Sequence, residues 1–249
     1  MPELVKTLLL ICPLIFLGGF VDSVAGGGGL ITLPAYLMAG VPVHIAAGTN
    51  KVVNVSGSFI ASIKYFRSGK IRMHPALWAA AGALAGASFG ARIAIHLSER
   101  ALQGLMLVAL PVVAVFLVTK KEFGQEGGGR TCSSRYERWV SLGIGVAVGC
   151  YDGIVGPGTG TLLIMAFTAL LYMDMVTASG CAKVGNVASN VAAAIIFVLG
   201  GKVMWAVVVP AAACSILGNY CGAQYAIRGG GKRIRGMIFV VLGLMFLKM

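Results

Sequence analysis

Two lysines and two aspartates stand inside sequence that is otherwise apolar. Lys51 and Lys183 each lie about nine residues into a long hydrophobic segment, roughly 12 Å from its start if the segment is helical. Asp22 and Asp152 begin the stretches DSVAGGGG and DGIVGPGTG, in which glycines follow the carboxylate. Ionisable residues at such depth in a membrane normally face the protein interior or a cavity and mark substrate or proton pathways.

The lysines and the glycine-rich stretches together predict an anion site. An ammonium group offers three donors and a full charge. A helix that breaks at glycines presents free backbone N–H groups and a positive dipole end to an oxyanion. The residues predicted to supply this backbone are Gly26, Gly27, Gly28, Gly29, Gly156, Gly158, Thr159 and Gly160.

Asparagines accompany each lysine as neutral donors. Asn50, Asn54 and Ser58 are four residues apart and share one helix face. Asn186 and Asn190 have the same spacing beside Lys183. We predict that Asn50, Asn54, Asn186 and Asn190 bind the substrate together with Lys51 and Lys183.

The aspartates have two interpretations. A carboxylate inside the membrane is a candidate proton relay, which predicts proton coupling by Asp22 and Asp152. Alternatively, Lys51 or Lys183 forms a buried ion pair with Asp22 or Asp152. The two interpretations coexist if the substrate competes for the lysines. Asp174 stands at the start of a segment and is predicted to be a helix cap.

The composition indicates a membrane protein. The 249 residues are 58% hydrophobic and 11% charged, whereas soluble domains carry about 25% charged residues. The mean hydropathy is +0.89, and the 36 glycines suit closely packed membrane helices. The net charge of +12 fits basic cytoplasmic loops better than nucleic-acid binding.

Neither a metal site, a cofactor nor an enzyme is predicted. The six cysteines include no C-x-x-C pair, and the three histidines form no H-E-x-x-H motif. Ser56 and Ser58 have no base in reach, because His44, His74 and His96 all lie near segment ends.

Hydrophobic runs predict an all-α polytopic transmembrane bundle of about ten segments. They cover 4–21, 30–40, 43–66, 73–97, 101–119, 139–151, 161–173, 175–199, 203–227 and 234–249. A full crossing needs about 20 residues, so 30–40, 139–151 and 161–173 are short and predict broken helices at glycine-rich turns. Surface loops at these places, or eight passes with two re-entrant segments, stay as alternatives.

The N-terminal run resembles a signal peptide, but the repetition of Asp22 in the second half indicates that it belongs to the fold.

Basic residues predict the orientation. They cluster in three loops, at Lys64, Arg67, Lys70 and Arg72, at Lys120, Lys121, Arg130, Arg135 and Arg138, and at Arg228, Lys232, Arg233 and Arg235. With ten passes these loops share one side, which the excess of lysine and arginine assigns to the cytoplasm.

The chain is predicted to consist of a first transmembrane repeat at 1–119, a cytoplasmic linker at 120–138 and a second repeat at 139–249. A shift of 132 residues aligns TNKVVNV with CAKVGNV, and Gly86 and Gly90 with Gly218 and Gly222. Five crossings per half would insert the second repeat upside down. Inverted repeats are typical of secondary transporters, whose sites lie at the repeat interface.

DSVAGGGGLITLP, GTNKVVN and their weaker copies DGIVGPGTG and GCAKVGN resemble the TauE/SafE sulfite exporter family, also called the 4-toluenesulfonate uptake permease family. The resemblance covers nearly the whole chain outside the linker. It implies a carrier of the bacterial cytoplasmic membrane with duplicated halves, linked to sulfite, sulfonates and related organosulfur anions. Export is the more usual assignment. Cys181-Ala182 replaces Thr49-Asn50 in the second half, so the two half-sites are unequal.

The function we predict is secondary transport of a small sulfur-containing oxyanion, by alternating access at a site between the repeats. An anion channel and an uptake permease for another small anion are the alternatives. The expected partners are the anionic substrate and the lipid bilayer, with no nucleic acid; a homodimer stays open.

Overall fold

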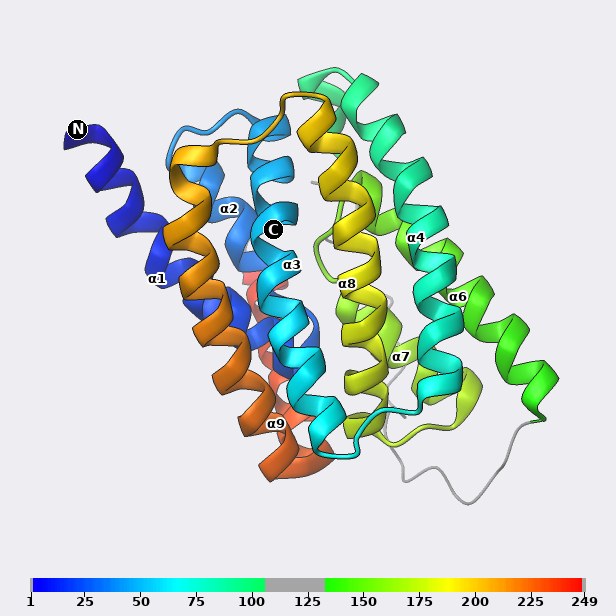
Figure 1. The fold of residues 1–249 in the computed structure, drawn as a ribbon. Helices are drawn as coiled ribbons and strands as arrows, with labels where there is room; N and C mark the ends of the chain where they lie inside the picture. Colours follow the sequence, from blue (N-terminus) through cyan, green and yellow to red (C-terminus); the bar gives the residue numbers. More distant parts are fainter. Residues whose placement is uncertain (1, 106–132, 248–249) are drawn as a thin grey trace.

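The computed structural model describes residues 2–105 and 133–247, and this part of the chain is helical without strands (Figure 1). Residues 99–105 are also helical. The bounded helices are α1 (Pro2–Ala25), α2 (Gly29–Met38), α3 (Val43–Arg67), α4 (Met73–His96), α6 (Ser134–Ile154), α7 (Thr159–Leu171), α8 (Met175–Leu199) and α9 (Trp205–Leu247). Most of the predicted segment 101–119, and the linker through Cys132 with Lys120, Lys121 and Arg130, lie outside the described residues.

The short segments are partly as predicted. α2 has 10 residues and α7 has 13, which confirms short helices at 30–40 and 161–173. The prediction of a short segment at 139–151 is wrong, because α6 begins at Ser134 and has 21 residues, about 31 Å. Its first turn is polar, so hydrophobicity did not mark its start. Asp174 is confirmed as the N-cap of α8, where its carboxylate accepts from the N–H groups of Val176 and Thr177.

The last two predicted segments follow each other in α9 and are separated by a kink. α9 spans 43 residues but bends at Gly230, whose φ of 64° and ψ of −166° are not helical. By length and composition, four stretches in the described part of the chain can cross a membrane: Leu4–Ala25, Met73–His96, Met175–Leu199 and Trp205–Ile238. Large apolar side chains such as Leu9, Phe89 and Val209 are more than half exposed, as expected of a surface in lipid.

Two three-helix groups surround the centre of the bundle. α9 packs against α1 and α3, while α4 packs against α6 and α8 (Figure 1). α3 and α8 also contact each other and join the groups. Each group therefore contains helices from both halves of the sequence.

Closely spaced glycines bring the outer helices together. A Cβ added at Gly86 or Gly90 in α4 would lie 2.2 Å from a carbonyl oxygen of α6. A Cβ added at Gly218 or Gly222 in α9 would lie 2.1 or 2.3 Å from a carbonyl oxygen of α1. These distances are shorter than any real contact, so the glycines confirm the predicted close approach of backbones.

The turn after α8 packs on the start of α3, and the turn after α3 packs on the start of α8. A Cβ added at Gly48, near the start of α3, would lie 2.0 Å from the carbonyl oxygen of Lys202, which follows α8. A Cβ added at Gly180, near the start of α8, would lie 2.0 Å from the carbonyl oxygen of Lys70, which follows α3. α3 and α8 therefore run in opposite directions, and the contacts repeat at an interval of 132 residues.

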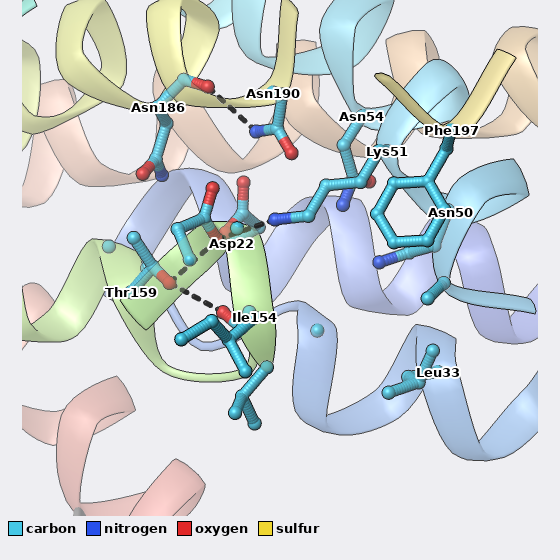
Figure 2. A pocket seen from close by; sticks show the side chains of 18 residues that line it. Asp22, Leu33, Asn50, Lys51, Asn54, Ile154, Thr159, Asn186, Asn190 and Phe197 are labelled. Carbon is cyan, nitrogen blue, oxygen red and sulfur yellow. Dashed lines mark hydrogen bonds and ion pairs between the residues drawn. The ribbon is translucent and has the colours of Figure 1, made fainter. Parts of the chain in front are cut away.

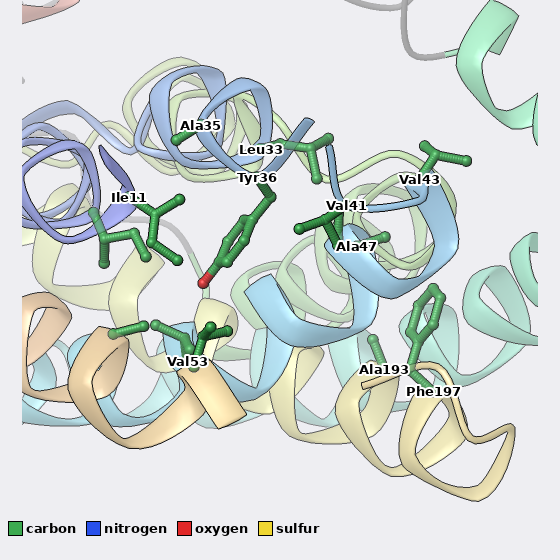
Figure 3. Close-up of a cluster of buried hydrophobic side chains, with 14 of the residues drawn as sticks. Ile11, Leu33, Ala35, Tyr36, Val41, Val43, Ala47, Val53, Ala193 and Phe197 are labelled. Carbon is green, nitrogen blue, oxygen red and sulfur yellow. The ribbon is translucent and has the colours of Figure 1, made fainter. Parts of the chain in front are cut away.

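The short helices lie within protein. Tyr36 of α2 is fully buried in an apolar cluster with residues of α1, α3 and α8, several of which Figure 3 shows. Phe167 and Leu171 of α7 are buried against the first half of α8. Interrupted helices are tolerated at membrane depth when protein covers them, and this packing satisfies that condition.

We predict that Gly86→Ala destabilises the protein and that Gly143→Ala does not. The first Cβ would overlap the Val146 carbonyl oxygen, and overpacking of this kind costs about 1–3 kcal/mol. Gly143, on α6, has no atom within 4 Å of its added Cβ, so alanine there gains up to about 1 kcal/mol of helix propensity. Thermal unfolding in detergent measures both; equal midpoints for the two variants would contradict the close-packing interpretation.

Candidate functional site

Two helix breaks meet at the centre of the molecule. The first lies between α1 and α2, where Gly26 has a φ of 76°, and the second between α6 and α7, where Gly156 has a φ of 88°. A Cβ added at Gly26 would lie 2.1 Å from the backbone of Gly160, and the Thr161 hydroxyl donates to the Ala25 carbonyl at 2.6 Å. The two breaks thus contact each other directly.

The first ion pair joins α3 to the end of α6. Lys51 Nζ lies 2.7 Å from Asp152 Oδ1, and both side chains are buried, with exposed fractions of 7% and 5%. The Thr159 hydroxyl, at the start of α7, lies 2.7 Å from the same Oδ1 and 2.6 Å from the Gly156 carbonyl oxygen, and its single hydrogen serves one of these two acceptors at a time. The break between α6 and α7 therefore places a carboxylate and a hydroxyl beside the ammonium group (Figure 2).

The second ion pair joins α8 to the end of α1. Lys183 Nζ lies 2.5 Å from Asp22 Oδ2, and the Lys183 side chain has no exposed surface. Each lysine is thus paired with the aspartate of the other half of the chain. The sequence left open which lysine meets which aspartate, and the structure pairs both.

The four charges cancel within the site. An unpaired lysine at the centre of a membrane helix costs about 2.5–3.5 kcal/mol on insertion scales, and removing one partner of a buried pair is strongly destabilising. The paired aspartates offset the cost of burying Lys51 and Lys183. An anion that binds to Lys51 must therefore compete with Asp152.

A cavity adjoins the first pair (Figure 2). Its free volume of about 30 Å³ is enough for a few water molecules. Twelve of the predicted site residues line it: Asp22, Gly26, Gly29, Asn50, Lys51, Asn54, Asp152, Gly156, Thr159, Gly160, Asn186 and Asn190. The predicted residues that do not line it are Lys183, Gly27, Gly28 and Gly158.

Six lining residues were not predicted: Leu33, Ala47, Gly153, Ile154, Val155 and Phe197. The three at 153–155 lie between Asp152 and Gly156, so the glycine-rich stretch itself could have indicated them. Leu33, Ala47 and Phe197 are apolar residues within apolar helices, and no sequence signal distinguishes them from core residues.

Several buried oxygens at the cavity have no hydrogen-bond partner among the described residues. They are Asn50 Oδ1, Asp152 Oδ2, Asn186 Oδ1 and Asn190 Oδ1. Asn190 Nδ2 donates to the Asn186 carbonyl at 2.7 Å, as Figure 2 shows, which fixes the amide orientation of Asn190. The residues that line the cavity thus include unpartnered acceptors as well as the Lys51 ammonium.

The two halves of the site are unequal. Thr159, which holds Asp152, corresponds to Gly29 in the first half, and Asn50 corresponds to Ala182 in the second. Gly156 also has a steric role, since a Cβ there would lie 3.2 Å from Lys51 Nζ. The cavity, the hydroxyl and the amide all belong to the Lys51 side.

Comparison with known proteins gives consistent matches over nearly the whole chain. The profile of the family described as "Sulfite exporter TauE/SafE" matches residues 11–249. A "Probable membrane transporter protein" of Haemophilus influenzae is 35% identical over 242 residues, which cover 94% of this chain and 91% of the relative. Escherichia coli "Probable membrane transporter protein YfcA" is 30% identical over 255 residues, covering 99% and 94%.

A third relative, "Probable membrane transporter protein ORF9" of Sinorhizobium sp., is 34% identical over 227 residues, covering 91% of this chain and 85% of the relative. No solved structure matches the chain significantly.

We predict that the Lys183–Asp22 pair shows strong coupling in a double-mutant cycle. Lys183→Met and Asp22→Leu should each lower stability by about 3–5 kcal/mol, because each leaves a buried charge alone. The double variant should recover most of that loss. Thermal unfolding of the four proteins in detergent measures the cycle, with exposed Lys70→Met as the control. Additive losses would show that the two charges do not depend on each other.

Proposed function

Because the chain belongs to the TauE/SafE sulfite exporter family and is a multi-pass membrane transporter, we propose that its cargo is a small sulfur-containing oxyanion, such as sulfite or a sulfonate. The chain acts as a carrier without covalent chemistry. Its substrate binds at the cavity between the two helix breaks.

The observation that carries this proposal is the position of Lys51. Its ammonium group is buried and borders the cavity. The neighbouring side chains carry groups that can form hydrogen bonds with a bound anion. Asn50 and Asn54 come from its own helix, while Thr159 and the backbone at Gly156 come from the opposing break. This set provides one full positive charge and several neutral polar groups, which suits a small singly charged oxyanion.

Alternating access between two inverted repeats is the proposed mechanism. Three features support it: the opposite directions of α3 and α8, the crossed ion pairs, and the contacts that recur 132 residues apart. Sites of such carriers lie at the repeat interface and are built from discontinuous helices. The break between α6 and α7 in the second half matches the break between α1 and α2 in the first half.

The basic end of the bundle is proposed to face the cytoplasm. Lys64 Nζ donates to Gln224 Oε1 at 2.8 Å, which brings the ends of α3 and of the first part of α9 together. Arg72, before α4, pairs with Glu137 in the first turn of α6. The described basic residues of the three predicted loops thereby share one end, and positively charged loops normally stay inside. The relatives are bacterial, so we place the protein in the bacterial cytoplasmic membrane.

Export is the proposed direction, in keeping with the description of the family. Asp22 and Asp152 are the proposed proton-coupling groups, because each aspartate is paired with a lysine that would attract the anion.

A permanently open anion channel is the competing mechanism. Saturable counterflow of labelled substrate in liposomes supports the carrier, and single-channel currents support the channel.

We predict that Lys51→Ala abolishes binding of sulfite and sulfonates, because it removes the only lysine that lines the cavity in the described part of the chain. Thermal shift and counterflow of the purified protein measure the loss against a panel of sulfite, sulfate, thiosulfate, sulfonates and carboxylates. Lys70→Ala, at an exposed turn, is the control and should bind as the natural protein does.

Lys183→Ala is expected to abolish binding as well, by freeing Asp22 at the edge of the cavity. Retained binding of the anion by both Lys51→Ala and Lys183→Ala would refute the proposed site.

A further inference from the structure

The two oxygens of Asp152 have different surroundings. Oδ1 forms the ion pair with the Lys51 ammonium at 2.7 Å and has the Thr159 hydroxyl as a neighbour at 2.7 Å. Oδ2 is buried and has no hydrogen-bond partner in the described part of the chain, on a residue that is 4% exposed and lines the cavity. A carboxylate with one oxygen in an ion pair and the other oxygen without a partner has a defined place for a proton.

The charge of the site restricts what can bind. With Lys51 and Asp152 both ionised, the pair is neutral, so an anion that enters alone leaves one uncompensated negative charge at membrane depth. Such a charge is costly in a medium of low polarity. If a proton binds with the anion, the loaded site is neutral again.

We propose that this protein carries one proton together with each anion, and that the proton binds to Oδ2 of Asp152. The inference rests on the proposed anion function. The proton comes from the aqueous side to which the site opens and converts the Asp152 carboxylate into a carboxylic acid. Lys51 keeps its own proton throughout and exchanges Asp152 for the anion as its partner.

The other charged groups near Asp152 do not provide an equivalent position. From α1, Asp22 reaches the same cavity and is also bound by a lysine, Lys183 of α8, but in the described part of the chain Asp22 has no oxygen that is both buried and without a partner. On α6 itself, the Tyr151 hydroxyl is engaged with the Pro157 carbonyl at 2.6 Å. From α4, the surface facing Gly153 is backbone of Ala87, Gly90 and Ala91. α3 contributes Lys51 and α7 contributes Thr159, the two partners already on Oδ1.

Joint movement of anion and proton makes the loaded carrier electrically neutral. The membrane potential then neither drives nor opposes the loaded step. Export proceeds whenever the ratio of internal to external anion exceeds the opposing ratio of proton concentrations. The empty carrier, with its pairs closed, returns without net charge as well.

The test uses the purified full-length protein in liposomes that contain a pH-sensitive dye. Ethanesulfonate is the probe, because it remains ionised and cannot itself carry the proton. With potassium and valinomycin holding the potential at zero, an inward ethanesulfonate gradient should acidify the lumen by about one proton for each anion. An imposed potential should leave the rate unchanged. Protein-free liposomes give the passive background.

The outcomes separate this inference from the proposed function. Absence of saturable flux for both ethanesulfonate and sulfite would refute the anion function itself. Saturable flux with no proton movement, with alkalinisation, or with a rate that follows the potential would overturn proton symport alone.

Two variants test the position of the proton. Asp152→Asn should lose lumen acidification while counterflow of labelled ethanesulfonate continues. In the natural protein, apparent anion affinity should fall as the pH rises, because anion and proton bind together, and in the variant it should not change. Acidification that persists in Asp152→Asn and disappears in Asp22→Asn would overturn the assignment to Asp152. The stoichiometry of the natural protein decides the symport itself, even if a variant does not fold.

Discussion

The crossed pairing of two lysines with two aspartates is the interaction on which the structure depends. An unpaired ammonium or carboxylate group at this depth would destabilise the protein, because hydrocarbon and the protein interior solvate charges poorly. Lys51 and Lys183 lie on α3 and α8, whereas the aspartates with which they pair lie in the last turns of α6 and α1. To bring each carboxylate to an ammonium group of the other half, the chain must break beside both aspartates and place the two halves in close contact.

Glycine makes that arrangement sterically feasible. Gly26 packs on Gly160 where the two breaks meet, and Gly48 and Gly180 accept the turns that follow the opposite long helices. Each of these positions has a carbonyl or backbone atom where a side chain would begin. The polar centre and the close helix packing are therefore parts of one design, since any widening of the bundle would also separate the ion pairs.

The two halves of the chain differ at the site. The Lys183–Asp22 pair reaches the cavity only through Asp22 and has Gly29 where the other half has Thr159, while both members of the Lys51–Asp152 pair line the cavity beside several buried acceptors. In the proposed mechanism, the Lys183–Asp22 pair holds the bundle together and the Lys51–Asp152 pair exchanges partners. Such a division explains why Asn50 and Thr159 occur once each, although the lysine and the aspartate occur twice.

The sequence alone determined the membrane class, the four central charges, the helix breaks and most residues of the cavity. It did so because a charge or a glycine run in apolar sequence is visible one residue at a time. Only the tertiary structure decided that Lys51 meets Asp152 and Lys183 meets Asp22, and that Lys183 lies outside the cavity lining. It alone revealed Phe197 and Leu33 as lining residues and Ser134 as the start of α6. The physical reason is that the choice of ion-pair partner and the access of a side chain to the cavity depend on the relative positions of antiparallel helices. Local sequence does not encode those positions.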